Sequence, residues 1–283
     1  SAHAASAPHL GRSALDACEL MNVGVNYLRE HMKSSDRIHY AYTNAGGKAP
    51  NVVQSEAVLK YFVRSATNPE CEELYQRVIN WAKGAALMTG SEVEVIFDEG
   101  LSNQVPNFVL EDVLDKSFKK LYKNDYTDEE LVYAAYFKET YDINNSLSDL
   151  PQFVKDRNRL ITNIKERVIN DYYVETLHSD ICDMGSTDVG DVSWCVPTAQ
   201  FNTACYSIGA GAHSWQWVAQ GKSSIALKGA MRAGEILCDA AINLHNNPEI
   251  IVKAKEELNN RLMGNSYKCL IPDDVKPHIS NVE

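Results

Sequence analysis

The sequence predicts an α/β protein whose first part is of the α+β kind. Two observations support this: apolar residues recur at helical spacing in several long segments, and short apolar or alternating segments bounded by turn residues lie between them. Apolar residues make up 45% and charged residues 23% of the chain, which is typical of a globular protein. The 283 residues leave room for one large domain or two ordinary ones.

The first hundred residues alternate between helix and strand patterns. From the start of the chain we expect a helix over 15–28, strands at 38–42, 51–53 and 58–65, a helix from Pro69 that Gly90 stops, and a half-buried strand over 93–97. A sheet with both helices on one face satisfies this order. If another strand preceded Ser1, the unit would be a split βαβ sandwich.

The pattern changes after residue 101. Pro106 opens a helix, and Thr127 with the three acidic residues that follow is typical of a helix N-terminus. The remaining expected elements are a helix over 153–177, a polar loop over 183–191, a buried strand over 205–208, a loop over 209–214, helices over 223–244 and 248–263, and an irregular tail from Pro272.

Charge and cysteine content exclude several classes of protein. With 27 basic and 38 acidic residues the net charge is −11, so we expect no nucleic-acid partner and no polybasic attachment to a membrane. No apolar stretch reaches the roughly 20 residues that span a bilayer, and no signal peptide is recognisable. The seven cysteines are scattered and form no CxxC pair, which predicts a reducing, cytoplasmic location.

Three loops concentrate reactive side chains. The first carries His3, the second carries Thr187, Asp188 and Asp191, and the third carries His213. His213 follows a glycine-flanked turn after an apolar segment, where an imidazole binds a metal, acts as a base or serves only the loop. The two aspartates either share a site or form hydrogen bonds within a turn. No phosphate-binding GxxxxGK, dinucleotide-binding GxGxxG or nucleophilic GxSxG motif occurs.

Several motifs in order resemble one known family. Ser1 to Ala5 with Pro8 and the segment 11–17 resemble the opening of the lid, or dimerisation, domain of the M20 metallopeptidase and amidohydrolase family, and segments 50–53 and 63–65 match later parts of that domain. Segments 185–193 and 211–217 resemble loops of the second half of its catalytic domain. Within the family, the likeness is greatest to the aminobenzoyl-glutamate utilisation protein B group.

The resemblance implies a lid domain over 1–101 and the C-terminal half of an α/β zinc-peptidase-like catalytic domain over 102–283. It implies two divalent metal ions, zinc or manganese, that activate a water for attack on an amide carbonyl. His213 matches a metal ligand, and His3 matches the lid histidine that polarises the scissile carbonyl in a partner subunit's site. The matching substrate-binding positions are Asn51, Arg64, Thr187, Asp188 and Asp191. Of the two in the lid, Asn51 is the better candidate for holding substrate oxygens, and Arg64 either binds substrate or is structural.

The resemblance also implies a partner and a substrate class. A His3 that acts across subunits implies a homodimer formed through the lid, although a related two-subunit arrangement fits as well. The substrate would be a small amide, an N-acyl or N-aroyl amino acid such as aminobenzoyl-glutamate. The alternatives are a non-catalytic dimerisation or regulatory subunit of the family, and an α/β binding protein that shares only the fold.

One departure from the family is large. The other metal ligands and the glutamate base precede the lid in the family, and no HxxGHD-like segment occurs in this sequence. One imidazole cannot hold a dinuclear metal site. We therefore expect this chain by itself to bind metal poorly and to lack hydrolase activity, and we expect further polypeptide, in the same or another chain, to complete the sheet.

Overall fold

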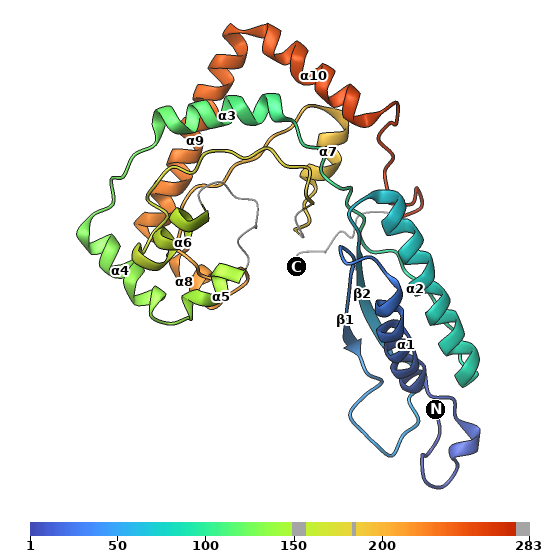
Figure 1. The fold of residues 1–283 in the computed structure, drawn as a ribbon. Coiled ribbons are helices and arrows are strands. Elements are labelled where there is room, and N and C mark those ends of the chain that lie inside the picture. Colours follow the sequence, from blue (N-terminus) through green and yellow to red (C-terminus); the bar gives the residue numbers. More distant parts are fainter. Residues whose placement is uncertain (149–156, 183–184, 276–283) are drawn as a thin grey trace, which may run out of the picture. The chain divides into compact units, whose positions relative to one another are not determined.

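The computed structural model describes residues 1–148, 157–182 and 185–275. The chain divides into two compact units. Unit 1 comprises Ser1–Asn103, Cys182–Asp191 and Lys268–Glu283, and unit 2 comprises Gln104–Ile181 and Val192–Tyr267. Both helices and strands are present, as an α/β fold requires, and helices predominate (Figure 1).

Unit 1 is built from two helices and a two-stranded antiparallel sheet (Figure 1). Its elements are α1 (Ala14–Leu28), β1 (Arg37–Asn44), β2 (Val58–Arg64) and α2 (Asn68–Thr89), with short 3-10 turns at Pro8–Leu10 and Arg29–His31. Ser13 caps α1 by accepting a hydrogen bond from the Asp16 N–H. Gly90 ends α2 in the left-handed conformation with φ of 64°, as its position in the sequence predicts.

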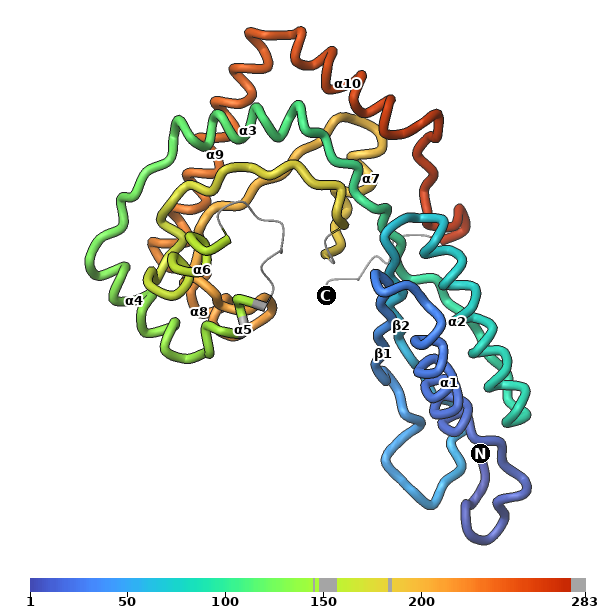
Figure 2. The backbone as a smooth tube through the Cα atoms, in the orientation of Figure 1, coloured from blue at the N-terminus to red at the C-terminus, as the bar shows by residue number. Residues whose placement is uncertain are grey.

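Both helices of unit 1 pack on the same face of the sheet (Figure 2). The core consists of Val25 and Leu28 from α1, Leu74 and Val78 from α2, and Ile38 from β1. The helices approach closely at Gly24, where a Cβ atom would come within 2.1 Å of the Trp81 ring. The predicted placement of both helices on one face is therefore confirmed.

Two strands that the sequence predicts in unit 1 are corrected by the structure. Residues 51–53 form only an isolated bridge, in which Val52 pairs with His3. Residues 93–97 have no regular secondary structure, although their apolar and acidic side chains alternate. A strand exists only where a neighbouring strand accepts its hydrogen bonds, and in the described residues β1 and β2 pair only with each other.

Unit 2 is helical, and three of its helices form its largest packed group. Helix α3 (Phe108–Leu121) packs against α9 (Ser224–Asn246) and α10 (Pro248–Leu262). The shorter helices are α4 (Asp128–Lys138), α5 (Ile143–Ser148), α6 (Arg157–Glu166) and α8 (Trp215–Gln220), and α7 (Val189–Cys195) crosses the boundary between the units in sequence. Thr127 and Glu130 form a complete capping box at α4, as the sequence predicts.

The helix expected over 153–177 ends early. Residues 149–156 lie outside the described part, and α6 stops at Glu166. Beyond it the chain is extended: Ile169 forms an antiparallel bridge with Ser207, and the Ile208 N–H donates to the Val168 carbonyl at 2.8 Å. The strand expected over 205–208 is reduced to this bridge, so a long-range pairing replaces the helical turn that local periodicity favours.

The remaining loop predictions hold in part. The expected loop over 183–191 gives way to α7 from Val189, and residues 183–184 lie outside the described part. Residues 272–275 are irregular as expected, and 276–283 lie outside the described part. The loop expected before α8 is present, and Ser214 at its end is the N-cap of α8.

Candidate functional site

His3 and Asn51 are brought together in unit 1. The Ala4 N–H donates to the Asn51 carbonyl at 2.9 Å, and the Val53 N–H donates to the Ala2 carbonyl at 2.8 Å. The imidazole of His3 is exposed, and its Nδ1 accepts hydrogen bonds from the N–H groups of Ala5 at 3.2 Å and Ser6 at 3.1 Å. An accepting Nδ1 leaves the proton of the neutral ring on Nε2. His3 is therefore held as a hydrogen-bond donor that faces solvent.

Arg64 lies in unit 1 but at the other end of β2. Residues 51–53 precede the start of this strand and Arg64 ends it, so the length of β2, about 20 Å, separates them. The Arg64 guanidinium lies 5.8 Å from the centre of the Phe62 ring. Arg64 and the His3–Asn51 pair are therefore two separate parts of unit 1.

Thr187, Asp188 and Asp191 form a tight turn that leads into α7. The Gly190 N–H donates to the Thr187 carbonyl at 3.1 Å, and the Val189 N–H donates to the Thr187 hydroxyl at 3.3 Å. The carboxylate of Asp191 accepts from the hydroxyl of Ser102 at 2.6 Å and from its N–H at 3.3 Å. Asp191 thus fastens the turn to Ser102, while the Asp188 side chain is exposed.

The turn needs a glycine at position 190 because it passes very close to the backbone of Ser102. A Cβ atom at this position would lie 2.0 Å from the carbonyl oxygen of Ser102, far inside van der Waals contact. The two backbone segments therefore approach more closely than any other residue type permits.

His213 lies in unit 2, on the turn just before α8. Its backbone is left-handed, with φ of 58°, a conformation that costs a residue with a Cβ atom about 1 kcal/mol. The imidazole is exposed. Non-glycine residues in this conformation persist where surrounding contacts hold them and are often found at functional sites.

A buried polar network holds the turn that carries His213. Gln220 is fully buried; its amide oxygen accepts from the Ser207 N–H at 2.8 Å, and its amide nitrogen donates to the Ser207 hydroxyl at 3.1 Å. Tyr141 donates to the Ile208 carbonyl at 2.7 Å, and the Trp217 indole donates to the Ala210 carbonyl at 2.9 Å. Burial raises the pKa of Tyr141, so its hydroxyl stays a donor at neutral pH.

Sequence reasoning did not predict this network. Its members lie far apart in the chain, and a glutamine in a short helix gives no sign that it is buried. The one available indication is the spacing of Gln216 and Gln220, four residues apart and therefore on one face of α8. Both are buried, and Gln220 donates to the Gln216 carbonyl at 3.0 Å.

The donor groups of the described residues do not fit a dinuclear metal centre. Within 1–148, 157–182 and 185–275, no group of three or more His, Cys, Asp and Glu side chains is arranged to hold a metal ion. His213 offers one imidazole, whereas a catalytic zinc needs three protein ligands. Its predicted role as a metal ligand depends on groups beyond those described here.

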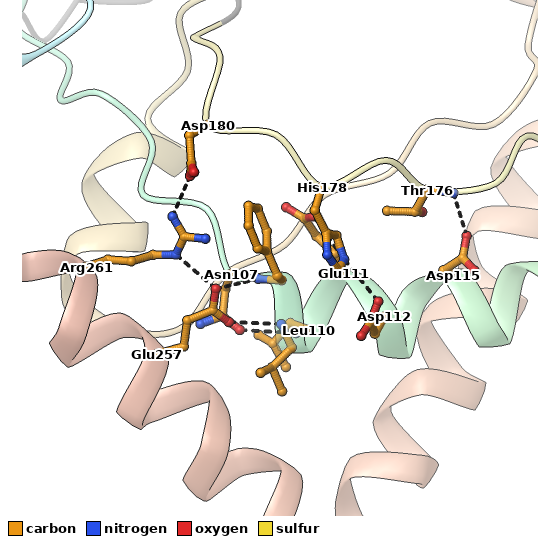
Figure 3. Close-up of polar contacts among 12 residues, drawn as sticks. Asn107, Leu110, Glu111, Asp112, Asp115, Thr176, His178, Asp180, Glu257 and Arg261 are labelled. Atoms are coloured by element: carbon orange, nitrogen blue, oxygen red, sulfur yellow. Dashed lines mark hydrogen bonds and ion pairs between the residues drawn. The ribbon is translucent and has the colours of Figure 1, made fainter. Parts of the chain in front are cut away.

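A second polar cluster, also not predicted, surrounds the start of α3 in unit 2 (Figure 3). Glu257 of α10 accepts from the N–H groups of Phe108 at 3.0 Å and Val109 at 2.9 Å, which the helix terminus leaves unpaired. Arg261 donates to Glu257 at 2.9 Å and to Asp180 at 2.6 Å. Burial works to raise the pKa of Glu257, but these hydrogen bonds and the Arg261 charge outweigh it and hold that pKa below its ordinary value.

The Phe108 ring lies in the same cluster and contacts two further side chains. The imidazole of His178 is stacked on this ring with centroids 4.4 Å apart, and its Nε2 lies 3.0 Å from the Asp112 carboxylate. The Arg261 guanidinium lies 4.1 Å from the centre of the ring. The cluster joins α10, α3 and the extended segment through His178, and is structural.

Comparison with known proteins identifies the group to which these features belong. The chain is 37% identical over 280 residues to the B subunit of p-aminobenzoyl-glutamate hydrolase from Escherichia coli, a match that covers 98% of this chain and 58% of that protein. It is 33% identical over 120 residues to Xaa-Arg dipeptidase of Mus musculus, covering 42% of this chain and 28% of the relative. The chain is a relative of the M20 metallopeptidases and amidohydrolases. The chain is also 35% identical over 86 residues to the Haemophilus influenzae homolog of the A subunit of p-aminobenzoyl-glutamate hydrolase. This match covers 30% of this chain and 20% of that protein.

The curated relatives are named as hydrolases or dipeptidases, and this chain spans less than two thirds of their length. No protein-family model matches the chain. In the described part of the chain, no helix is long and apolar enough to cross a membrane.

Proposed function

We propose that this chain contributes the lid and the C-terminal part of the catalytic domain to a metal-dependent amidohydrolase of the M20 family. The substrate is an N-acyl or N-aroyl amino acid, with aminobenzoyl-glutamate as the best candidate. The observation that carries this proposal is the 37% identity to the B subunit of the hydrolase over 98% of the chain. A lid over 1–101 followed by part of a catalytic domain over 102–283 remains our domain assignment, and a reducing, cytoplasmic compartment remains our expected location.

In this proposal each candidate residue has a defined task. His3 donates its Nε2–H to the oxygen of the amide carbonyl, which becomes negatively charged during attack. Asn51 holds a substrate oxygen beside His3, whereas Arg64, at the far end of β2, has a structural role. Thr187, Asp188 and Asp191 line the substrate pocket. His213 is one ligand of a zinc or manganese site, and a bound metal pair would supply an activated water.

A related polypeptide, rather than a second copy of this chain, is the partner we propose. The relatives are named as two different subunits of one hydrolase, which supports a heteromeric arrangement. The expected homodimer has no support in these names. Either this partner or further polypeptide of the same chain supplies the remaining metal ligands and the glutamate base.

Hydrolysis of p-aminobenzoyl-glutamate tests the proposal. The purified 283-residue chain, with zinc or manganese added, should release no p-aminobenzoate and should bind less than one metal ion, because His213 is the one family metal ligand that it supplies. Combined with its complementing subunit, it should be active. His3→Ala should then lower kcat at least 100-fold, about 2.7 kcal/mol of lost transition-state stabilisation, with metal content unchanged.

His9→Ala is the matched control, because His9 lies in the same segment and only its backbone is used, as an acceptor for Arg12. Activity of the isolated chain would contradict the proposed division of the site. Full assembly with bound metal but no amide hydrolysis would favour the alternative, a non-catalytic dimerisation or regulatory subunit.

A further inference from the structure

A small cavity in unit 2 lies between the end of α3 and the first half of α9. Its volume is about 20 Å³, and the residues that line it include Phe118, Tyr122, Tyr126, Thr203, Gly229 and Arg232. Gly229 allows its wall to pack closely, because a Cβ atom there would lie 2.4 Å from the Ala204 carbonyl oxygen. A cavity of this volume holds about one species the size of a water molecule.

Arg232 is a buried cation in the wall of this cavity, and only 9% of the residue is exposed. Its Nη1 donates to the Lys123 carbonyl at 2.5 Å, and its Nη2 donates to the Asp125 carboxylate at 2.7 Å. Its Nε is buried and has no hydrogen-bond partner among the described residues. A buried donor of a charged group is costly to leave unpaired, and such a group points to an ion or a water bound beside it.

Two tyrosines in the wall supply further donors. Burial raises the pKa of Tyr126 to about 12 and also raises the pKa of Tyr122, so both hydroxyls keep their protons at neutral pH. In the described part of the chain, neither hydroxyl has a hydrogen-bond partner. The Thr203 hydroxyl, by contrast, already donates to the Gly229 carbonyl at 3.0 Å. Three donors of the wall are therefore available to a ligand that accepts hydrogen bonds.

Arg232 makes the cavity electropositive, because the acid that pairs with it is more exposed to water. The Asp125 side chain is 49% exposed, whereas the Arg232 side chain is 10% exposed. Water and salt screen an exposed charge much more than a buried one. The charges that act on Tyr126 agree with this, since Arg232, which lowers its pKa, has a larger effect than Asp125, which raises it. An anion is therefore favoured in the cavity over a cation.

We propose that this cavity binds one chloride ion, which accepts hydrogen bonds from Arg232 Nε and from the hydroxyls of Tyr122 and Tyr126. Donors on a charged group bind an anion strongly. The volume admits a single small ion and excludes phosphate, sulfate and carboxylates. The bound ion joins α9 to the end of α3 and so stabilises unit 2. This site goes beyond the proposed function and does not depend on it.

Thermal unfolding of the 283-residue protein tests the site. Circular dichroism follows unfolding in mixtures of sodium chloride and sodium gluconate at one fixed ionic strength, so that general screening of charge is constant. A ligand that binds only the folded state raises the melting temperature as its concentration rises. An increase from about 10 to 300 mM chloride should raise the melting temperature by about 3 °C. Crystals grown in sodium bromide should show an anomalous scattering peak in the cavity.

Variants then assign the effect of chloride to this cavity. Tyr126→Phe keeps the ring and removes one donor, so it should weaken chloride binding at least fivefold and remove most of the rise in melting temperature. Arg232→Lys keeps a cation but lacks the Nε donor, and it should lose the rise as well. The chloride-dependent difference is compared, so a lower overall stability of either variant does not obscure the result. Tyr136→Phe, at an exposed tyrosine of α4 in the same unit, is the matched control and should keep the full rise.

Three results would overturn the chloride site. The first is a melting temperature that does not depend on chloride at fixed ionic strength. The second is a bromide crystal in which the cavity holds only water. The third is a full chloride-dependent rise in Tyr126→Phe, because the ion would then bind elsewhere. None of these measurements involves hydrolysis, so the loss of this site would leave the proposed function intact.

Discussion

His213 has a backbone conformation that lowers the stability of the fold. Its left-handed backbone is typical of glycine and disfavours a side chain with a Cβ atom. His213→Gly should therefore raise the free energy of unfolding by about 1 kcal/mol relative to His213→Ala, which keeps the strain and removes only the ring. Urea unfolding of the two variants measures this difference. Equal midpoints and slopes for both would show that the backbone at this position is unstrained.

Which residues the sequence could predict depends on how local their interactions are. Thr127, Glu130 and Gly90 act within one helical turn, and their roles as caps follow directly from the sequence. The role of Gln220 depends on its contact with Ser207, and that of Asp191 depends on its contact with Ser102. Such pairings arise only in the folded chain, so spacing in the sequence contains no trace of them.

At the scale of elements, Glu257 joins the end of one helix to the start of another. It accepts from the free N–H groups at the start of α3, and its pKa is lowered below the ordinary value. Glu257→Gln should lower the free energy of unfolding by about 1–2 kcal/mol at pH 7, because it removes the carboxylate charge from the positive end of α3.

The effect of Glu257→Gln should depend on pH in one direction. A carboxyl whose pKa is lower in the folded state stabilises the fold above its unfolded pKa, and this contribution is lost as pH falls through the folded value. The difference in unfolding free energy should therefore shrink below about pH 4. Denaturant unfolding between pH 3 and 7 checks this, with the exposed neighbour Glu256→Gln as the control. A difference that stays constant over that range would exclude the charge as the cause.

Helices were predicted better than strands for a physical reason. The periodicity of α1, α2, α9 and α10 is contained within each helix, and all four are found close to their expected ranges. The alternation of apolar and acidic residues over 93–97 indicates only which side chains could face a core. Whether these residues form a strand depends on a neighbouring strand elsewhere in the chain. The helix expected over 153–177 ends early because Ile169 pairs with Ser207 instead. The two residues lie far apart in the sequence, so local periodicity could not predict this pairing. The candidate site follows the same rule: the loop composition singled out His3 and the family resemblance added Asn51, but neither predicted the hydrogen bond between their segments.

At the scale of the molecule, α9 has an apolar stripe on the side that faces away from its core. The buried side holds Ile225, Ile236 and Ala240, whereas Leu227, Met231 and Ile242 follow at helical spacing on the exposed side. Met231 is 70% exposed. Several large exposed apolar side chains on one side of a helix are typical of a surface that another polypeptide covers. In the proposed function, the polypeptide that completes the enzyme covers this stripe.

Removing one member of the stripe should separate its role in assembly from any role in folding. Met231→Glu should leave the melting temperature of the 283-residue chain within about 2 °C, because the side chain is exposed and its loss removes little buried surface. It should lower binding of a hydrophobic fluorescent dye and weaken at least tenfold the association with the complementing subunit, since a charge would have to be buried at the interface. Lys253→Gln, an exposed polar position on α10, should change neither. Unaltered assembly by Met231→Glu would show that the partner covers a different surface of the molecule.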